Sequence, residues 1–164
     1  MVCSLFRLRR GVWQTSTIAA LAFLVVGCSE GKVSQCNQLI GVANQAVTQV
    51  QSVTQSANPA PGAPGTSNAN NANNIEAMTR IATAADQART EMEGLQFSDE
   101  RLTQFQSRFV AMYTEIGNAT RALVSSAQAS NSQGAQQAFD QLKTATEKEA
   151  PLVTEVNQYC ANPQ

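Results

Sequence analysis

The sequence predicts an all-α protein, an up-down-up-down four-helix bundle with a long flexible loop between its first two helices. Apolar residues recur at alternating spacings of three and four over four segments of the 164-residue chain, the pattern of helices with one buried face. Turns of a few residues separate the second, third and fourth segments, so these neighbours are expected to be antiparallel. The bundle is expected over residues 34–160, followed by a tail over residues 161–164.

The first helix is expected over residues 34–56. Its predicted inner face is a seam with spacings of four and three, flanked by further apolar side chains: Cys36, Ile40, Ala43, Val47, Val50 and Thr54, with Leu39, Val42, Ala46 and Val53 beside them. Residues 57–74 follow, with three prolines, two glycines and no charged side chain. Proline removes a helical hydrogen bond, so this low-complexity stretch is predicted to be a flexible loop. A proline-rich ligand for a partner is the alternative.

The second helix is expected over residues 74–96 and the third over residues 99–129, with Ser98 as the N-cap of the third. The predicted inner face of the second helix consists of Ile75, Met78, Ala82, Ala85, Met92 and Leu95, with Ile81 and Ala88 beside them. That of the third consists of Leu102, Phe105, Phe109, Met112, Ile116, Ala119 and Leu123, with Tyr113 alongside. These bulky side chains place the centre of the core on the third helix.

The fourth helix is expected over residues 135–160, after a turn at residues 131–134. Its predicted inner residues are Ala135, Ala138, Leu142, Ala145, Leu152, Val156 and Tyr159, with Phe139 and Val153 flanking. Pro151 lacks a backbone donor, so it predicts a kink or a restart of this helix. Glu149 lies near the apolar seam. We expect the proline offset to turn Glu149 toward solvent, and a buried carboxylate with a function is the alternative.

The N-terminal segment has the layout of a secretory signal. Arg7, Arg9 and Arg10 precede a short apolar run over residues 18–26, which ends in Gly27 and Cys28. Val25-Val26-Gly27-Cys28 resembles the processing site of bacterial lipoprotein precursors. The resemblance implies a signal peptide over residues 1–27, a lipid on Cys28 and a tether over residues 28–33.

Such a protein is attached to a membrane of the cell envelope and faces the periplasm or the exterior. An uncleaved transmembrane anchor is the alternative, because residues 11–29 are uncharged and just long enough to span a bilayer. A twin-arginine signal at Arg9-Arg10 is a weaker one, since the residues that follow fit that motif poorly.

The same resemblance implies a fate for each of the four cysteines. Cys3 would leave with the signal and Cys28 would carry lipid, so Cys36 and Cys160 remain as a pair in an oxidising compartment. In an up-down-up-down bundle the start of the first helix and the end of the fourth lie at the same end. We therefore expect a disulfide between Cys36 and Cys160, with two free thiols as the alternative.

Composition excludes several classes of function. Residues 1–27 contain three of the eleven basic residues and none of the twelve acidic ones, so the processed chain has a net charge of −4. This charge argues against nucleic acid as a partner and against a surface that binds anionic lipid. The chain has no histidine, which excludes histidine-dependent hydrolases, haem attachment and histidine zinc sites. We expect no enzyme, no cofactor and no metal.

Four acidic residues lie close together in the sequence near one predicted turn. Glu91, Glu93, Asp99 and Glu100 crowd the turn between the second and third helices. Oxygen ligands suit Ca²⁺, but the spacing is not that of a calcium loop. A solvated acidic tip is expected.

These observations predict a non-catalytic, membrane-anchored lipoprotein that acts as a binding or structural helical module for an unknown protein partner. One alternative is an accessory extrinsic subunit of a membrane complex. Extrinsic four-helix lipoprotein subunits of photosystems have a similar general plan, and this likeness is architectural only. Another alternative is a carrier with a small ligand in the bundle core, in space left by the alanine-rich seams. A cavity of several hundred Å³ would favour a carrier, and a fully packed core would exclude one.

Overall fold

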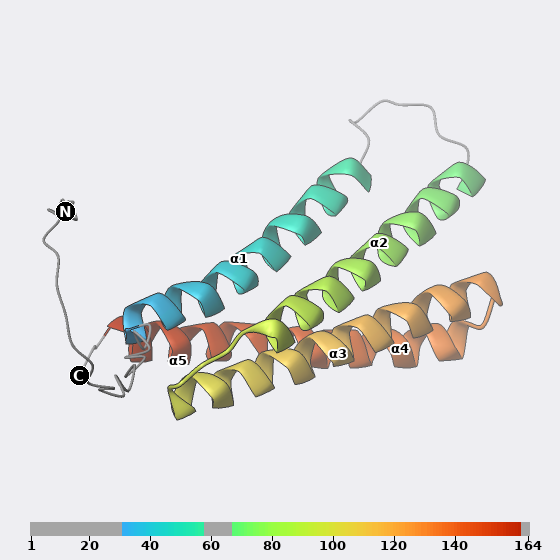
Figure 1. The fold of residues 1–164 in the computed structure, drawn as a ribbon. Helices are drawn as coiled ribbons and strands as arrows, with labels where there is room; N and C mark the ends of the chain where they lie inside the picture. Colours follow the sequence, from blue (N-terminus) through green and yellow to red (C-terminus); the bar gives the residue numbers. More distant parts are fainter. Residues whose placement is uncertain (1–30, 58–66, 162–164) are drawn as a thin grey trace, which may run out of the picture.

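The computed structural model describes residues 31–57 and 67–161. They form five helices: α1 (Lys32–Ala57), α2 (Ser67–Gly94), α3 (Glu100–Gln128), α4 (Ser132–Thr146) and α5 (Glu149–Ala161). The last two follow each other as one bent rod, so the five helices make four rods (Figure 1). The predicted all-α bundle is confirmed. The predicted signal peptide, Cys28 and the residues between α1 and α2 lie outside the described ranges.

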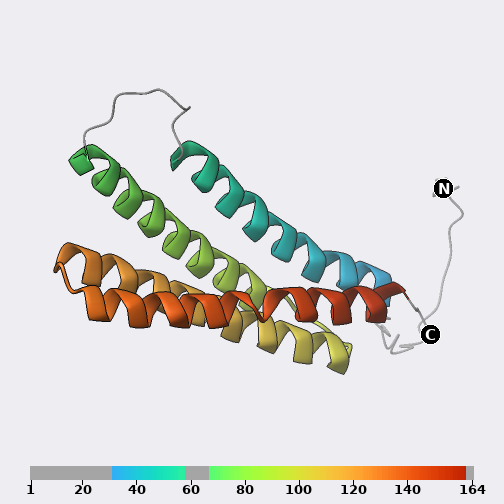
Figure 2. The ribbon, with the colours of Figure 1, turned by 180° about the vertical axis from the view of Figure 1, so that it is seen from behind.

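Consecutive rods run in opposite directions. The most extensive packing joins α2 to α3, α3 to α4 and α1 to α2. Both views show the start of α1 beside the end of α5, while toward its other end α1 diverges from α4 (Figures 1 and 2). The helices therefore converge at one end of the molecule and separate toward the other.

No helix within the described ranges is both long and apolar enough to cross a membrane.

The converging end is held by a disulfide and by a buried glutamine. Cys36 and Cys160 are bonded, with their Cα atoms 5.9 Å apart, which confirms the predicted pairing. The neighbouring Gln35 is 3% exposed. Its Nε2 donates to Ser98 Oγ at 2.9 Å, and its Oε1 accepts from the backbone N–H of Ser98 at 2.9 Å. The first turn of α1 is thus joined both to α5 and to the turn between α2 and α3.

The cap of α3 differs from the sequence prediction. Asp99, rather than Ser98, is the N-cap, and its Oδ1 accepts from the N–H of Leu102 at 3.0 Å. The hydroxyl of Ser98 accepts from Gln35 instead, a partner distant in sequence that local reasoning could not include. Asp99 also accepts, at 2.7 Å, a hydrogen bond that the Tyr159 hydroxyl donates.

Two further helix boundaries differ from expectation. Helix α2 begins at Ser67 rather than near residue 74, so the second half of the expected loop is helical. No proline lies between Pro64 and Pro151, and asparagine and serine each cost a helix only roughly 0.5–0.7 kcal/mol relative to alanine. Helix α4 begins at Ser132, with Asn131 as its N-cap, earlier than the expected residue 135.

The predicted interruption near Pro151 is present. Helix α4 ends at Thr146 and α5 begins at Glu149, so the fourth rod restarts two residues before the proline. This places Pro151 in the first turn of α5, where the missing backbone N–H removes no helical hydrogen bond.

The main buried cluster lies toward the converging end, and α3 supplies most of its largest side chains. The buried cluster consists of Cys36, Leu39, Ala46, Ala88, Met92, Leu102, Phe105, Phe109, Met112, Tyr113, Leu152 and Val156. All of these residues lie on faces that the sequence predicted. Every described helix, this cluster and the disulfide lie within residues 31–161, so a chain that begins at Ser29 retains all of them.

Three predicted core positions are exposed. On α1, Val47 is 38% exposed and Thr54 is also exposed, whereas Leu39, Ala46 and Val53 are buried. Helix α1 packs mainly against α2 and contacts α3 and α5 less, so its buried face is narrower than its apolar face. Phe139 on α4 is 52% exposed, because no described helix packs on that side of it.

The disulfide is predicted to supply a large share of the stability. It joins residues 124 apart, and closing a loop of that length stabilises a fold by about 5 kcal/mol in the chain-entropy model. Because domains are stable by only about 5–15 kcal/mol, Cys36→Ser should lower the melting temperature markedly. Thermal unfolding followed by circular dichroism measures this. The matched control is the double variant with Cys160→Ser, which should melt like the single one; an unchanged melting curve in reducing agent would contradict the prediction.

Candidate functional site

An apolar cleft of about 300 Å³ lies where the separating rods face one another. All five helices contribute to its wall. The lining residues are Ala46, Val47, Val50 and Gln51 of α1, Ile81, Ala84 and Ala85 of α2, Tyr113 and Ile116 of α3, Leu142 and Thr146 of α4, and Glu149 of α5. The cleft is therefore a property of the assembled bundle rather than of any one hairpin.

Small side chains and helix divergence together create this space. Ala46, Ala84 and Ala85 are each about 5% exposed and lie where larger side chains would meet the opposite wall. Val47 belongs to the predicted inner seam of α1, and it lines the cleft instead of being buried. Figure 2 shows that α1 diverges from α4 toward the end of α1. Alanine-rich seams predicted room between the helices, and the structure places that room between α1, α2 and α4.

Tyr113 lines the cleft and carries a buried hydroxyl. The residue is 5% exposed, and its ring stacks on Phe109 with ring centroids 6.0 Å apart. Its hydroxyl is buried and has no hydrogen-bond partner among the described residues. Burial raises the pKa of this hydroxyl well above its ordinary value, and the negative charge of Glu149 raises it further. The phenol therefore stays protonated at neutral pH.

An unpartnered buried donor is costly. Leaving such a group unsatisfied destabilises a fold by about 1–3 kcal/mol, and buried polar groups in proteins are rarely left in this state. Phenylalanine would fill the same volume without that cost. The Tyr113 hydroxyl is thus a feature that packing alone does not explain.

Glu149 is the one charged residue that lines the cleft. It is half-buried, so the expectation that the proline offset turns it to solvent is wrong. The cause is the interruption before it: α5 restarts at Glu149 itself, which returns this residue to the inner side of the rod. Within the described part of the chain it forms no ion pair, whereas its neighbour Lys148 pairs with Glu115.

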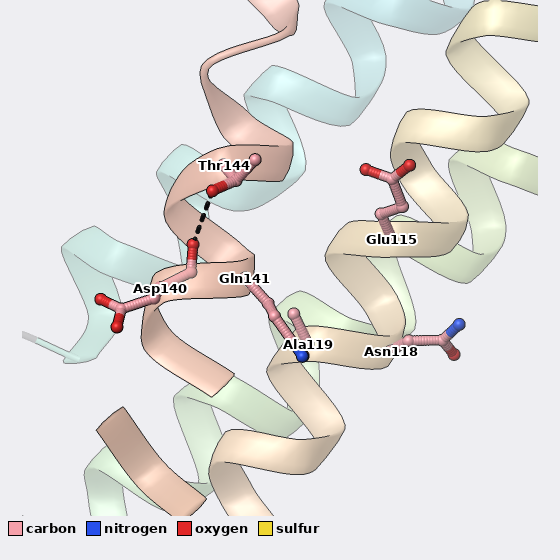
Figure 3. A pocket seen from close by; sticks show the side chains of 6 residues that line it. All are labelled: Glu115, Asn118, Ala119, Asp140, Gln141 and Thr144. Carbon is pink, nitrogen blue, oxygen red and sulfur yellow. Dashed lines mark hydrogen bonds between the residues drawn. The ribbon is translucent and has the colours of Figure 1, made fainter. Parts of the chain in front are cut away.

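Another hollow, of about 430 Å³, lies on the surface between α3 and α4. Figure 3 shows its six lining residues. The carboxylates of Glu115 and Asp140 do not point toward one another, and Thr144 donates to the Asp140 carbonyl at 2.9 Å. Glu115 forms an ion pair with Lys148. These groups do not converge on a common point, so they are not arranged to bind or react with one ligand atom.

A polar groove of about 650 Å³ lies beside the disulfide. Its charged groups engage one another: Arg108 donates to Glu155 at 2.6 Å, and Lys32 stacks over the Tyr159 ring at 3.7 Å. Burial raises the pKa of Asp99, but hydrogen bonds from Tyr159 and from backbone N–H groups, together with Lys32, outweigh this and bring it below its ordinary value. The groove is explained by the interactions that hold the converging end together.

The acidic residues near the turn between α2 and α3 do not form a common site. Glu91 accepts from Gln45 at 3.1 Å, Glu93 pairs with Arg89 at 2.8 Å, and Asp99 caps α3. No group of three or more potential metal ligands occurs in the parts of the chain that the structure describes.

Two features of the cleft were not predicted from the sequence. Tyr113 was assigned to the core beside the aromatic stripe, and nothing in the spacing distinguishes a tyrosine with a partner from one without. Glu149 was recognised as lying near the seam, and its position at the cleft depends on where α5 restarts.

Comparison with known proteins adds no relative to this description. No family model matches the chain, no curated protein matches it, and no solved structure matches it. The structure itself defines the class of protein: an all-α bundle closed by a disulfide at one end, with an apolar cleft between its diverging rods.

The two tyrosines are predicted to respond in opposite ways to loss of their hydroxyls. Tyr113→Phe should raise the free energy of unfolding by about 1 kcal/mol, because it removes a buried donor that has no partner. Tyr159→Phe is the matched control and should lower it by about 1 kcal/mol, because it breaks the hydrogen bond to Asp99. Chemical denaturation of both variants measures this. Destabilisation by Tyr113→Phe would mean that the hydroxyl has a partner within the protein.

Proposed function

We propose that this chain is a non-catalytic binding module of the cell envelope, attached to a membrane by lipid on Cys28, and that it binds a small ligand in the apolar cleft. The observation that carries the proposal is the cleft with its unpartnered tyrosine hydroxyl. A volume of about 300 Å³ is at the small end of the range of about 300–1,000 Å³ typical of ligand sites. Among the alternatives that the sequence left open, the cleft favours the carrier.

Two observations support the assignment to the envelope. The residues from Arg7 to Cys28 resemble a lipoprotein signal, and the disulfide between Cys36 and Cys160 suits an oxidising compartment. Cys28 precedes Cys36 by eight residues, so its lipid would attach close to the converging end of the bundle. Val47 lies eleven residues beyond Cys36 along α1, a rise of roughly 16 Å, so the cleft would lie further from such a membrane than the disulfide does.

The chemistry of the cleft supports binding rather than catalysis. Apolar side chains dominate its wall, and its titratable groups are the Tyr113 phenol and the Glu149 carboxylate. Burial holds the phenol in its protonated form, which makes it a poor base. These groups can orient a ligand by hydrogen bonding and charge.

The membrane attachment is tested by the mass of the protein. Expressed in a bacterium from the complete sequence, the chain should be recovered from membranes without residues 1–27 and with added lipid mass on Cys28. The control Cys28→Ser should retain residues 1–27 and carry no lipid, because serine cannot form the thioether. A wild-type mass equal to that of the complete, unmodified chain would contradict the proposal and favour an uncleaved anchor.

Ligand binding is tested by blocking the cleft. The chain that begins at Ser29 should bind the apolar fluorophore N-phenyl-1-naphthylamine saturably, with enhanced emission. Val47→Trp should weaken this binding by about tenfold or more, because the indole occupies space that the probe needs. Val33→Trp is the matched control: it changes another exposed valine of the same helix, away from the cleft, and should leave binding unchanged. Equal effects of the two substitutions would contradict the proposal.

A further inference from the structure

The chemistry of the ligand can be narrowed from the groups that line the cleft, and this step rests on the proposed function. Two polar groups determine which ligand chemistry the cleft favours: the Tyr113 hydroxyl and the Glu149 carboxylate. Gln51 and Thr146 also line the cleft but are exposed, and the Thr146 hydroxyl donates to the Lys143 carbonyl at 2.9 Å. The remaining lining residues are apolar, and they set the size and the character of the body that fits between the two polar groups.

The Tyr113 hydroxyl requires an acceptor. It is a protonated phenol on a residue that lines the cleft, so it can donate one O–H to a ligand acceptor that reaches it. No described protein atom accepts this proton. A ligand that places a carbonyl, ether or hydroxyl oxygen at this point would satisfy the donor, whereas a pure hydrocarbon would leave it buried and unpaired. An ammonium group would also leave it unpaired, since an ammonium has no acceptor.

Glu149 acts against negatively charged ligands. It is the one charged lining residue, and no lysine or arginine shares the cleft with it. The nearby Lys143 and Lys148 pair with Glu147 and Glu115 respectively. A carboxylate or phosphate inside the cleft would lose its hydration and meet a like charge without compensation, which disfavours it strongly.

The rest of the wall selects an apolar body of limited size. Ala46, Ala84 and Ala85 lie on one side, and Leu142 and Ile116 contribute larger aliphatic groups. These side chains offer no hydrogen bonds, so they favour a ligand whose remaining surface is hydrocarbon or aromatic.

We propose that the cleft binds an uncharged small molecule with an apolar body and one oxygen acceptor, which receives a hydrogen bond from the Tyr113 hydroxyl. The apolar body lies between the alanines of α2 and Leu142 of α4. The acceptor determines orientation, and Glu149 excludes anions.

Four probes with a common ring system test this assignment: naphthalene, 2-acetylnaphthalene, 2-naphthoate and 2-(aminomethyl)naphthalene. Each is titrated against the chain that begins at Ser29, loaded with N-phenyl-1-naphthylamine. 2-Acetylnaphthalene should displace the fluorophore at a concentration about tenfold lower than naphthalene, as expected for one hydrogen bond to a donor that is otherwise unpaired. 2-Naphthoate should be the weakest of the four.

Two conservative variants identify the groups responsible. In Tyr113→Phe the advantage of 2-acetylnaphthalene over naphthalene should disappear, while the affinity for naphthalene stays the same. In Glu149→Gln the affinity for 2-naphthoate should rise and that for 2-acetylnaphthalene should not change. Circular dichroism of each variant verifies that the helical fold is retained.

The outcomes separate this inference from the proposed function. Equal affinities for naphthalene and 2-acetylnaphthalene, or an advantage that survives in Tyr113→Phe, would overturn the ligand class while leaving ligand binding intact. Tightest binding of 2-naphthoate or of the amine would overturn it as well. Failure of the fluorophore and of all four probes to bind would instead overturn the proposed function itself.

Discussion

The covalent bond between Cys36 and Cys160 is the constraint on which the arrangement of this bundle depends. It joins the start of α1 to the end of α5, and Gln35 beside it joins the same turn to Ser98. Away from this end α1 packs mainly on α2, and it diverges from α4 (Figures 1 and 2). Because one end is closed by covalent and buried polar interactions, the helices can separate at the other without the bundle coming apart. The cleft is the space that this separation leaves.

Substitutions that would stabilise the fold would also remove the space that the proposed ligand needs. Larger side chains at Ala46, Ala84 and Ala85 would fill the cleft, and phenylalanine at position 113 would remove a buried donor without a partner. Both changes favour a packed and more stable core. The small side chains and the unpaired hydroxyl are the features on which the proposed ligand site rests.

Some of this could be predicted from the sequence and some could not. The four rods, the pairing of Cys36 with Cys160 and the restart near Pro151 were predicted because each depends on local chemistry or simple topology. The exposure of Val47 was not, since periodicity identifies residues on a shared face but not the width of the face that a partner covers. Ser98 was predicted to cap α3 from local sequence alone. Its actual hydrogen-bond partner, Gln35, is distant in sequence and could not be foreseen. Whether the Tyr113 hydroxyl finds a hydrogen-bond partner depends on the side chains that the other helices bring near it. A local sequence pattern contains no information about those side chains.

The central claim is that a small uncharged ligand occupies the cleft between the diverging rods. Methyl NMR of the chain that begins at Ser29, titrated with 2-acetylnaphthalene, tests it most directly because it reports where the molecule binds. We expect saturable shifts concentrated on the methyl groups of Ala46, Ala84, Ala85 and Leu142, with little change at Ala129 and Val33, which lie outside the cleft. Shifts centred on other surfaces, or changes that do not saturate, would contradict it.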